Sequence, residues 1–343
     1  MNFIKQAISH LVVGEDLDSE LMASVMNQIM NGEATDAQIG AFLIALRMNG
    51  ETTEEIVAAA RVMREKALKI PVSLSDDEVL VDTCGTGGDG LATFNISTAV
   101  SFVVAGAGIK VAKHGNRSIS SRSGSADCLE ALGIRLTLSP ERCAQAIEEI
   151  GIGFLFAPAL HPAMKYAIGP RREIGVRSLF NLLGPLCNPA SANVQLMGVF
   201  SYEFLSPLAD VLGILGAKNA WVIYGPDGMD ELGLSGINKI ASWESGKVRE
   251  FDLDPGDYGF KRYGIEEIRG EDAKHNASII LDIFSGQTGA CRDTVILNAG
   301  VAIYLAEKVD SLEDGFKMAA EVIDSGKALD KLNAIKEFSM AGK

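Results

Sequence analysis

A strand–turn–helix unit between residues 79 and 107 constrains the fold of this chain more than any other feature. The apolar run Val79–Thr83 is typical of a short buried strand, and it leads directly into the Gly-rich turn Cys84–Gly90. The apolar stretch over 97–107 then predicts a helix. Because such a strand is buried when helices cover its sheet, the unit favours an α/β fold.

Strands and helices continue to alternate along the rest of the chain, which indicates a mostly parallel central sheet. The predicted strands lie at 109–112, 153–156, 194–200, 220–224 and 278–281, with a hairpin over 238–252 that turns at Gly246. The predicted helices lie at 123–132, after Ser139-Pro140, and at 204–216, 292–306 and 312–339. Residues 161–187 are rich in Pro and Arg and are predicted to be less regular.

The N-terminal part has a different texture. Residues 3–69 have the apolar periodicity of four helices, and Thr35–Gln38 and Thr52–Glu55 are capping-box patterns that open the third and fourth. We therefore predict a small helical domain over residues 1–73, joined by part of 161–187, beside a large α/β domain over 74–343.

Composition limits the classes of function. Asp and Glu contribute 45 of the 343 residues and the formal net charge is −14, which argues against nucleic acid as a partner because phosphate backbones require a basic face. No apolar run is long enough to span a membrane, and the N-terminus has no signal-peptide pattern. Five widely spaced cysteines without a CxxC motif predict reduced thiols in a cytoplasmic protein.

One long stretch of this acidic chain carries no acidic residue. Between Asp89 and Asp127 the only ionised side chains are cationic, namely Lys110, Lys113, Arg117 and Arg122. Backbone N–H groups freed by glycines can point at phosphate oxygens, and nearby cations complete such a site. We therefore predict a site for the phosphate groups of a small molecule; the alternative is a Gly/Ser loop with scattered surface cations.

The Gly-rich turn also admits other interpretations. Gly85–Gly90 matches the GxGxxG pattern of dinucleotide-binding folds, but the acidic residue expected about 20 residues later is absent. No Gly-Lys-Ser/Thr follows, so the turn is not a P-loop. The side chains of Asn95–Thr98 can cap the next helix, and the free N–H groups there can bind an anion.

Several motifs together resemble those of the anthranilate phosphoribosyltransferase family, and the resemblance covers nearly the whole chain. They are Gly85-Thr-Gly-Gly-Asp89, Asn95-Ile-Ser-Thr98, Lys113-His-Gly-Asn-Arg117, Gly124-Ser-Ala-Asp127, Phe42–Met48, Arg177–Leu186, Asn188-Pro-Ala190, Asp227–Glu231 and Leu297-Asn-Ala-Gly300. The resemblance implies a nucleoside phosphorylase/phosphoribosyltransferase-like fold. It also implies transfer of the phosphoribosyl group of 5-phosphoribosyl 1-pyrophosphate (PRPP) to the amine of anthranilate in tryptophan biosynthesis, and a homodimer formed through the helical domain.

The resemblance further implies roles for individual residues. PRPP would be held by Gly85, Gly88, Asp89, Thr93, Asn95, Ile96, Ser97, Thr98, Lys113, His114, Gly115, Asn116, Arg117, Ser118, Ile119, Ser120, Ser121 and Ser125. Anthranilate would be contacted by Gly85, Asn116, Arg171, His114 and Pro185. Mg²⁺ would be held by Ser97, Asp230 and Glu231, since Mg²⁺ takes hard oxygen ligands and often shares them with substrate phosphates.

Two departures from the family pattern and two competing functions remain at this point. Gly169-Pro170 precedes Arg171 where the family more often has Pro-Val, so Arg172 is an alternative contact for anthranilate, and Cys187 replaces a commoner hydroxyl residue. Asp230-Glu231 could also be a solvated acidic turn. The competing functions are a pyrimidine nucleoside phosphorylase of similar architecture, which would need no metal pair, and a non-catalytic nucleic-acid-binding relative.

Overall fold

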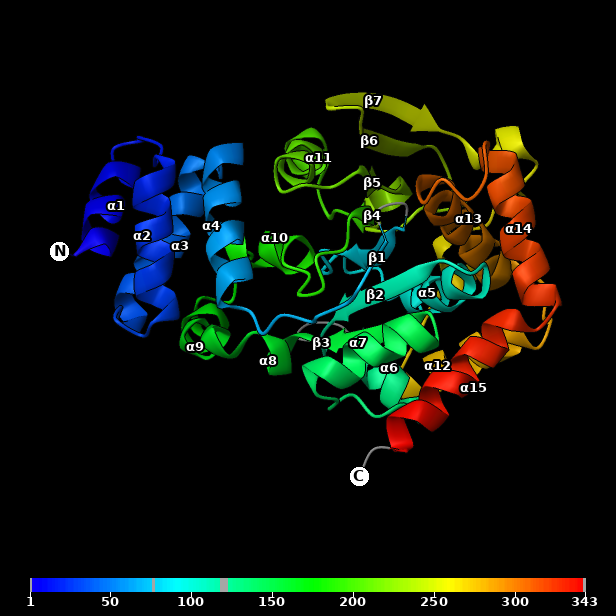
Figure 1. Cartoon of the computed structure of the whole chain (residues 1–343). Helices are drawn as coiled ribbons and strands as arrows, with labels where there is room; N and C mark the ends of the chain where they lie inside the picture. Colours follow the sequence, from blue (N-terminus) through cyan, green and yellow to red (C-terminus); the bar gives the residue numbers. More distant parts are fainter. Residues whose placement is uncertain (1, 76–77, 118–122, 342–343) are drawn as a thin grey trace.

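The computed structural model describes residues 2–75, 78–117 and 123–341, and in it a bundle of helices lies beside a sheet covered by helices (Figure 1). The bundle is formed by α1 (Phe3–Leu11), α2 (Ser19–Met30), α3 (Asp36–Asn49) and α4 (Thr53–Lys66). Both predicted capping boxes are present. The Thr35 hydroxyl accepts the Gln38 N–H at 3.3 Å while the Gln38 side chain accepts the Thr35 N–H at 3.0 Å.

The central sheet is mostly parallel, as predicted. Its strands are β1 (Leu80–Gly85), β2 (Lys110–Gly115), β3 (Ile152–Phe156), β4 (Val194–Gly198), β5 (Asn219–Tyr224), β6 (Asn238–Glu244) and β7 (Lys247–Leu253). In the described part of the chain they follow the order β3-β2-β1-β4-β5-β6-β7, with β1 to β5 parallel and the β6–β7 hairpin antiparallel. The hairpin turns at Ser245 and Gly246, which both have positive φ.

Helices cover both faces of the sheet. The segments between its strands supply α5 (Ile96–Gly106), α6 (Ser125–Ala131), α7 (Pro140–Glu149), α8 (Ala157–Leu160), α9 (Lys165–Ile174), α10 (Leu179–Leu186) and α11 (Leu205–Ile214). The chain after β7 supplies α12 (Ala273–Phe284), α13 (Ala290–Leu305), α14 (Leu312–Asp324) and α15 (Lys327–Met340). Short 3-10 turns are η1 (Pro162–Met164), η2 (Tyr202–Phe204), η3 (Pro226–Gly228), η4 (Pro255–Tyr258) and η5 (Ile265–Ile268). Helices α5 and α13 lie on one face, and α7 and α11 on the other.

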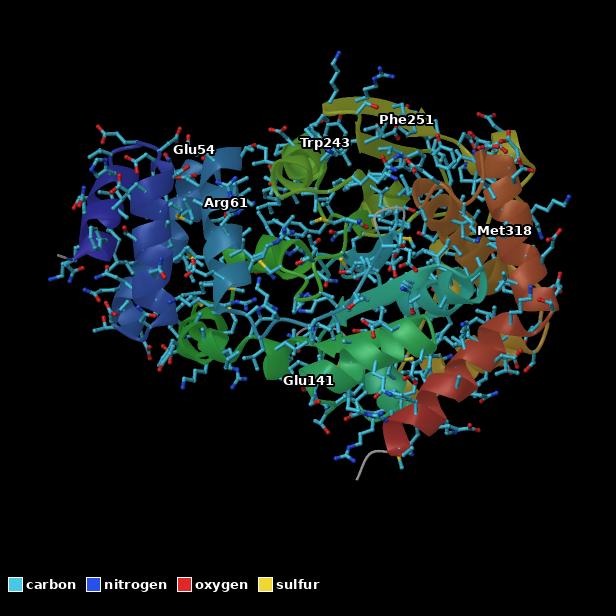
Figure 2. All side chains as sticks on the ribbon, viewed as in Figure 1. Glu54, Arg61, Glu141, Trp243, Phe251 and Met318 are labelled. Carbon is cyan, nitrogen blue, oxygen red and sulfur yellow. The ribbon has the colours of Figure 1, made fainter. Side chains whose placement is uncertain are left out.

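Side chains alternate between these two faces, as a strand requires. Trp221 and Ile223 of β5 enter the core under α5 and α13, whereas Ala220 and Val222 enter the core under α11. Trp243 of β6 also lies against α11, where its Nε1–H donates to the Ala217 carbonyl at 3.1 Å (Figure 2).

The helical bundle is attached to the sheet by a shared apolar core. The buried side chains of α1 to α4 form one cluster with those of α10, α11 and the adjoining face of β4 and β5. Helix α9 packs on α2 and α3, and α10 packs on α3 and α4. Arg64 of α4 adds polar links, because its Nε donates to the Leu186 carbonyl at 2.7 Å and its Nη1 to the Leu215 carbonyl at 2.9 Å. The division into domains at residue 73 stays a prediction.

Three local predictions are wrong. Much of 161–187 is helical, since α9 and α10 each continue through an internal proline, Pro170 and Pro185. The strand predicted at 278–281 lies inside α12, which is capped by Asp272 and buries Ala277, Ile280 and Ile283 on one helical face. The helix predicted over 312–339 is two helices. Gly326, with a φ of 79° in the left-handed region, interrupts the helical backbone between α14 and α15.

Candidate active site

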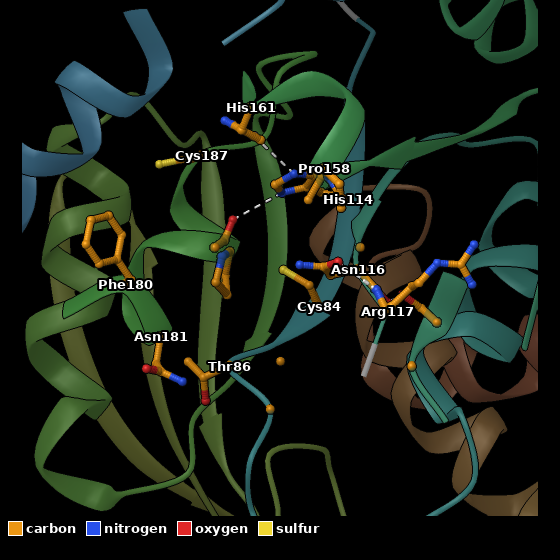
Figure 3. A pocket seen from close by; sticks show the side chains of 18 of the residues that line it. Cys84, Thr86, His114, Asn116, Arg117, Pro158, His161, Phe180, Asn181 and Cys187 are labelled. Carbon is orange, nitrogen blue, oxygen red and sulfur yellow. Dashed lines mark hydrogen bonds between the residues drawn. The ribbon is translucent and has the colours of Figure 1, made fainter. Parts of the chain in front are cut away.

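A cavity of about 650 Å³ lies at the carboxyl ends of the parallel strands. Gly85 at the end of β1 and Gly115 at the end of β2 lie on one side of it, and α8 to α10 form the opposite wall. In open α/β sheets the carboxyl ends of the strands are the usual place for ligands, because loops and helix N-termini converge there. Figure 3 shows this cavity from close by.

The Gly-rich turn after β1 lies along the cavity in a conformation that favours glycine. Gly87, Gly88 and Gly90 have φ values of 70°, 80° and 79°, in the left-handed region that side chains rarely adopt. The Gly87 N–H donates to Asp230 Oδ2 at 2.6 Å. The Arg177 guanidinium donates to the Gly88 carbonyl and lies 4.1 Å from the centre of the Phe200 ring. The turn is therefore held from both sides.

Asp230 and Glu231 reach the cavity because glycines give their segment room. A Cβ on Gly85 or Gly198, the last residues of β1 and β4, would overlap Asp230, and a Cβ on Gly225 would overlap the Glu231 carbonyl. Burial raises the pKa of Asp230 to about 7, with a further contribution from the charge of Asp89. Burial, followed by the charge of Asp230, raises the pKa of Glu231 to about 8. A bound cation would relieve the repulsion within this crowded acidic pair.

Lys113 and Ser97 lie beside this acidic pair. The Lys113 ammonium is buried and donates to the Thr83 carbonyl at 2.6 Å and to the Ser97 hydroxyl at 3.1 Å. The Ser97 N–H, at the start of α5, donates to Glu231 Oε1 at 3.2 Å. Burial lowers the pKa of Lys113, and the negative charges of Asp82 and Glu231 oppose that shift. Carboxylates, a hydroxyl and a cation therefore meet at one end of the cavity.

His114 and His161 form a buried pair further along the cavity (Figure 3). The two Nε2 atoms are 3.2 Å apart, and His114 Nδ1 lies 3.1 Å from the Gly184 carbonyl oxygen. A carbonyl only accepts, so Nδ1 of His114 carries the proton and its Nε2 accepts from His161. Burial lowers the pKa of His114 to about 3 and that of His161 to about 4, so both rings are neutral.

A buried polar network under the cavity fixes β2 and α10. Asp82 accepts the His114 N–H at 3.2 Å and the Asn188 side-chain N–H at 2.8 Å, and Asn188 also donates to the Ala112 carbonyl. Gln195 donates to the Pro185 carbonyl at 2.8 Å. Burial raises the pKa of Asp82 to about 6, against the opposing charge of Lys113. The network explains why Asn and Gln are buried here.

The far wall carries a cation with no acidic partner in the part of the chain that the structure describes. Arg171 of α9 lines the cavity with its guanidinium carbon 5.3 Å from the centre of the Phe180 ring, and burial lowers its pKa. Among the described residues no carboxylate lies within ion-pair distance of Arg171. A guanidinium in this position suits a planar carboxylate on a ligand.

Two glycosyl transferase family models match this chain, the helical bundle domain over residues 5–67 and the a/b domain over residues 77–329. An anthranilate phosphoribosyltransferase from Petrotoga mobilis is 50% identical over 97% of this chain and 96% of its own length. One from Syntrophotalea carbinolica is 51% identical over 97% of this chain and 98% of its own. The chain belongs to the anthranilate phosphoribosyltransferase family.

Solved structures of anthranilate phosphoribosyltransferases have the same fold. The crystal structure from Thermus thermophilus matches with a TM-score of 0.93 at 44% identity, over 99% of this chain and 100% of that chain. The Saccharomyces cerevisiae enzyme in complex with PRPP and Mg matches with a TM-score of 0.89 at 26% identity, over 98% of each chain. The predicted family, fold class and phosphoribosyl-transfer function are thereby confirmed, and the phosphorylase and nucleic-acid alternatives gain no support.

Most residues predicted for the phosphoribosyltransferase site are brought together. Those that line the cavity are Gly85, Gly88, Asn95, Ser97, Lys113, His114, Gly115, Asn116, Arg117, Ser125, Arg171, Pro185, Asp230 and Glu231. Arg172 lines it too, so both candidate arginines reach the cavity. The guanidinium of Arg117 points away from the cavity and pairs with Asp127 at 2.9 Å and with Glu130 at 2.6 Å (Figure 3).

Four predicted residues lie outside the cavity lining. Ile96 and Thr98 flank Ser97 on α5 and point into the core, because neighbours on a helix face different directions. Thr93 pairs with Arg269 in an isolated bridge, and Asp89 acts on Asp230 through its charge. Ser118, Ile119, Ser120 and Ser121 lie outside the described residues.

Sequence reasoning missed several residues of the phosphoribosyltransferase cavity. His161, Phe180, Asn181 and Gly184 line it without having been assigned a role. Phe180, Asn181 and Gly184 belong to a quoted motif, so the motif was a usable signal. His161 is one of four histidines in the chain, and only its distance from His114 in space distinguishes it.

Two features are absent within the described ranges: a ready-made metal cluster and a membrane-spanning helix. No group of three or more His, Cys, Asp or Glu side chains there is arranged to hold a metal ion unaided. No helix in the same ranges is long and apolar enough to cross a membrane.

Proposed function

We propose that this cavity is the site of phosphoribosyl transfer from PRPP to anthranilate, with the two substrates at opposite ends. One observation carries the proposal. At one end of the cavity Asp230 and Glu231 make no ion pair among the described residues, although the Lys113 ammonium lies nearby, and at the other end the half-buried Arg171 has no described carboxylate within ion-pair distance. A magnesium-bound pyrophosphate complements the first end, and the carboxylate of anthranilate complements the second.

The phosphate end is formed by backbone N–H groups and small polar side chains. Gly85 and Gly88 of the turn, Asn95 and Ser97 at the start of α5, and Ser125 at the start of α6 all line the cavity. Helix N-termini and glycine turns favour anions because their N–H groups lack partners within the helix. We propose that PRPP lies along these segments and the residues that follow Lys113. Asp89, Thr93, Ile96 and Thr98 would then act through backbone or neighbouring contacts.

The carboxylate pair fits Mg²⁺. Asp230 and Glu231 offer hard oxygen ligands, and each uses one oxygen to accept a backbone N–H, which leaves its other lone pairs available. Ser97 adds a hydroxyl. Two carboxylates do not complete an octahedral shell, so the pair would share Mg²⁺ with phosphate oxygens of PRPP. When bound, Mg²⁺ neutralises the charge that develops on the departing pyrophosphate.

The acceptor end is formed by Arg171, Asn116, Pro185, His114 and the Gly85 backbone, with Phe180 under the arginine. Arg171 would neutralise the anthranilate carboxylate, and Asn116 would orient the ring. His114 uses its Nδ1–H on Gly184 and its Nε2 on His161, so it shapes the wall without carrying a free proton to the substrate.

These positions account for the chemistry without a strong general base. The aromatic amine of anthranilate is uncharged near neutral pH and attacks C1 of the ribose, the bond from C1 to the pyrophosphate oxygen breaks, and the amine releases one proton. Catalysis then rests on positioning and on electrostatic stabilisation of the cationic C1 centre. The test is loss of anthranilate fluorescence on addition of purified protein, PRPP and Mg²⁺; no loss, or equal loss without PRPP, would reject the proposal.

We also propose a cytoplasmic homodimer. All five cysteines are free thiols, which suits a reducing compartment. Val12, Val13 and Met48 of the helical bundle are 67%, 70% and 84% exposed, and an exposed apolar group of this kind suits a contact with a second copy.

A further inference from the structure

Two buried asparagines stand out because asparagine is disfavoured where they lie. Asn298 is in the middle of α13 and Asn238 opens β6, and both are fully buried. Asparagine weakens helix interiors and strands, and burying its amide is costly unless every polar atom is bonded. Asn298 belongs to the motif Leu297-Asn-Ala-Gly300, whose role the assigned function leaves unexplained.

Each asparagine bonds both backbone groups of one residue in the segment after Glu231. Asn298 Oδ1 accepts the Leu232 N–H at 3.0 Å, and its Nδ2 donates to the Leu232 carbonyl at 2.9 Å. Asn238 Oδ1 accepts the Gly233 N–H at 2.8 Å, and its Nδ2 donates to the Gly233 carbonyl at 3.0 Å. The backbone N–H and carbonyl of Leu232 and of Gly233 are therefore bonded by side-chain amides, as a neighbouring strand would bond them in a sheet.

The amides are anchored in rigid elements. Asn298 Nδ2 also donates to the Thr294 carbonyl one turn earlier in α13, at 2.9 Å. Asn238 Nδ2 lies 3.4 Å from the Leu253 carbonyl at the end of β7. Asn298 thus ties the segment to α13 and Asn238 ties it to the β6–β7 hairpin, and both elements contribute to the same buried core. Hydrogen bonds made by a fully satisfied buried network fix geometry more than isolated surface bonds do.

The clamped residues are directly connected to the acidic pair. In the ionised forms that bind a cation, Asp230 and Glu231 carry like charges beside Asp89, so electrostatic repulsion acts to separate their side chains. Gly198 and Gly225 leave space for the segment, but space alone does not hold it. The bonds to Leu232 and Gly233 are the backbone restraints that follow the pair in the chain.

We infer that Asn298 and Asn238 are positioning residues that hold the Asp230–Glu231 backbone in the geometry needed to bind Mg²⁺ together with PRPP. This inference rests on the proposed metal role of the acidic pair. Neither asparagine lines the cavity, so in this inference both act only through the segment that they clamp. Their effect should appear in magnesium binding and not in anthranilate binding.

The test compares Asn298→Ala with Thr294→Val, a control of equal burial on the same helix, whose hydroxyl donates to the Ala290 carbonyl at 2.8 Å. In the Asn298→Ala protein, the Mn²⁺ dissociation constant with PRPP, read by electron paramagnetic resonance, should rise about tenfold or more, and the anthranilate KM should stay within about twofold. Amide hydrogen exchange of residues 229–236 should quicken in the metal-free protein. Thr294→Val should change none of these quantities.

A double-mutant cycle separates the clamp from the metal role. Asp230→Asn alone should weaken Mn²⁺ binding, and Asn298→Ala should add little in that background because the two act through one site. If Asp230→Asn leaves Mn²⁺ binding unchanged, the proposed metal role fails. If Asp230→Asn weakens binding but Asn298→Ala does not, only the clamp fails. Should Asn298→Ala not fold, Asn238→Ser serves as the second variant, and wild-type Mn²⁺ binding in that folded protein overturns the inference.

Discussion

Arg171 is the residue on which the acceptor end most depends. Its half-buried guanidinium packs against Phe180 and makes no ion pair with the other described residues, so its removal breaks no ion pair with them. Arg171→Ala should raise the anthranilate KM about tenfold or more, equivalent to about 1.4 kcal/mol of lost binding, and change the PRPP KM little. Steady-state kinetics with each substrate varied in turn measure both values.

Two matched variants sharpen this prediction. Lys113→Ala should produce the opposite pattern, since Lys113 lies at the phosphate end beside Ser97 and Glu231. Arg172→Ala should leave anthranilate binding near its original strength. An anthranilate-selective defect in Arg172→Ala would instead assign the carboxylate to Arg172, which also lines the cavity.

The buried histidine pair predicts a pH dependence of stability. The pKa values of His114 and His161 are lowered to about 3 and about 4 in the folded protein. Below about pH 6.5 the unfolded chain takes up protons that the folded pair does not, so the contribution of the pair to the free energy of unfolding falls as the pH drops toward 4. The raised pKa values of Asp82, Asp230 and Glu231, about 6, 7 and 8, act in the opposite direction, so the histidine contribution is read as a difference between variants. Each histidine contributes at most about 1.4 kcal/mol per pH unit.

Urea denaturation between pH 7.5 and about pH 4 measures this slope. His161→Gln keeps a side-chain nitrogen near His114 and removes one titrating group, so its free energy of unfolding should rise relative to that of the unmodified protein as the pH drops below about 6.5. His275→Asn, at an exposed position on α12, is the control and should keep the original slope. An unchanged slope in His161→Gln would contradict the assignment.

At the residue scale, the sequence predicted local groups well and distant partners poorly. Lys113, Ser97, Asp230 and Glu231 belong to short motifs whose chemistry is legible in the sequence, and all four line the cavity. The partner of His114 lies 47 residues away, and the residue clamped by Asn298 lies 66 residues away. Contacts of that kind depend on the packing of whole elements, which no local pattern encodes.

The glycines at the strand ends are the element-scale feature that admits the acidic pair. A Cβ at Gly198 would overlap the Asp230 carbonyl, and the neighbouring backbone has little room to move. Gly198→Ala should therefore lower the free energy of unfolding by about 1–3 kcal/mol and raise the PRPP KM. Urea denaturation and substrate kinetics measure the two effects.

Gly264→Ala is the matched control for Gly198→Ala. Gly264 has a φ of −77° and open space where its Cβ would lie. The free energy of unfolding of the Gly264→Ala protein should stay within about 0.5 kcal/mol of that of the unmodified protein. If Gly198→Ala were equally mild, the close approach of β4 to the acidic segment would have no structural importance.

Elements with clear end signals were predictable, and elements interrupted by proline were not. The capping boxes at Thr35 and Thr52 and the turn at Gly246 specify their ends locally. Pro170 and Pro185 read as helix breakers, yet α9 and α10 continue through them because packing on the bundle offsets the lost hydrogen bond. In α12 the apolar run 278–281 suggested a strand, and only the longer helical spacing from Ala277 to Phe284 identifies a helix.

At the scale of the whole molecule, the helical bundle and the acceptor end of the site share one core. Helices α9 and α10 carry Arg171 and Pro185, and both pack on the bundle. Arg64 fixes the end of α10 and the end of α11 to α4. The position of the acceptor end relative to the phosphate end is therefore set by packing between the bundle and the sheet.

The outer side of that bundle predicts the assembly. Val12 and Val13 follow α1, and Met48 lies near the end of α3, where Asn49 bonds Asp16 at 2.9 Å and brings the two segments together. Covering this apolar group with a second copy would remove it from water.

Sedimentation equilibrium should give about twice 36.4 kDa for the unmodified chain. Val13→Asp/Met48→Asp should shift the mass toward the monomer, because an unpaired carboxylate in the contact is costly. The control is Ile237→Asp, at an exposed position in the described loop before β6, which should leave the mass unchanged. A monomeric unmodified chain would exclude this contact. A dimer unaffected by Val13→Asp/Met48→Asp would place the contact elsewhere.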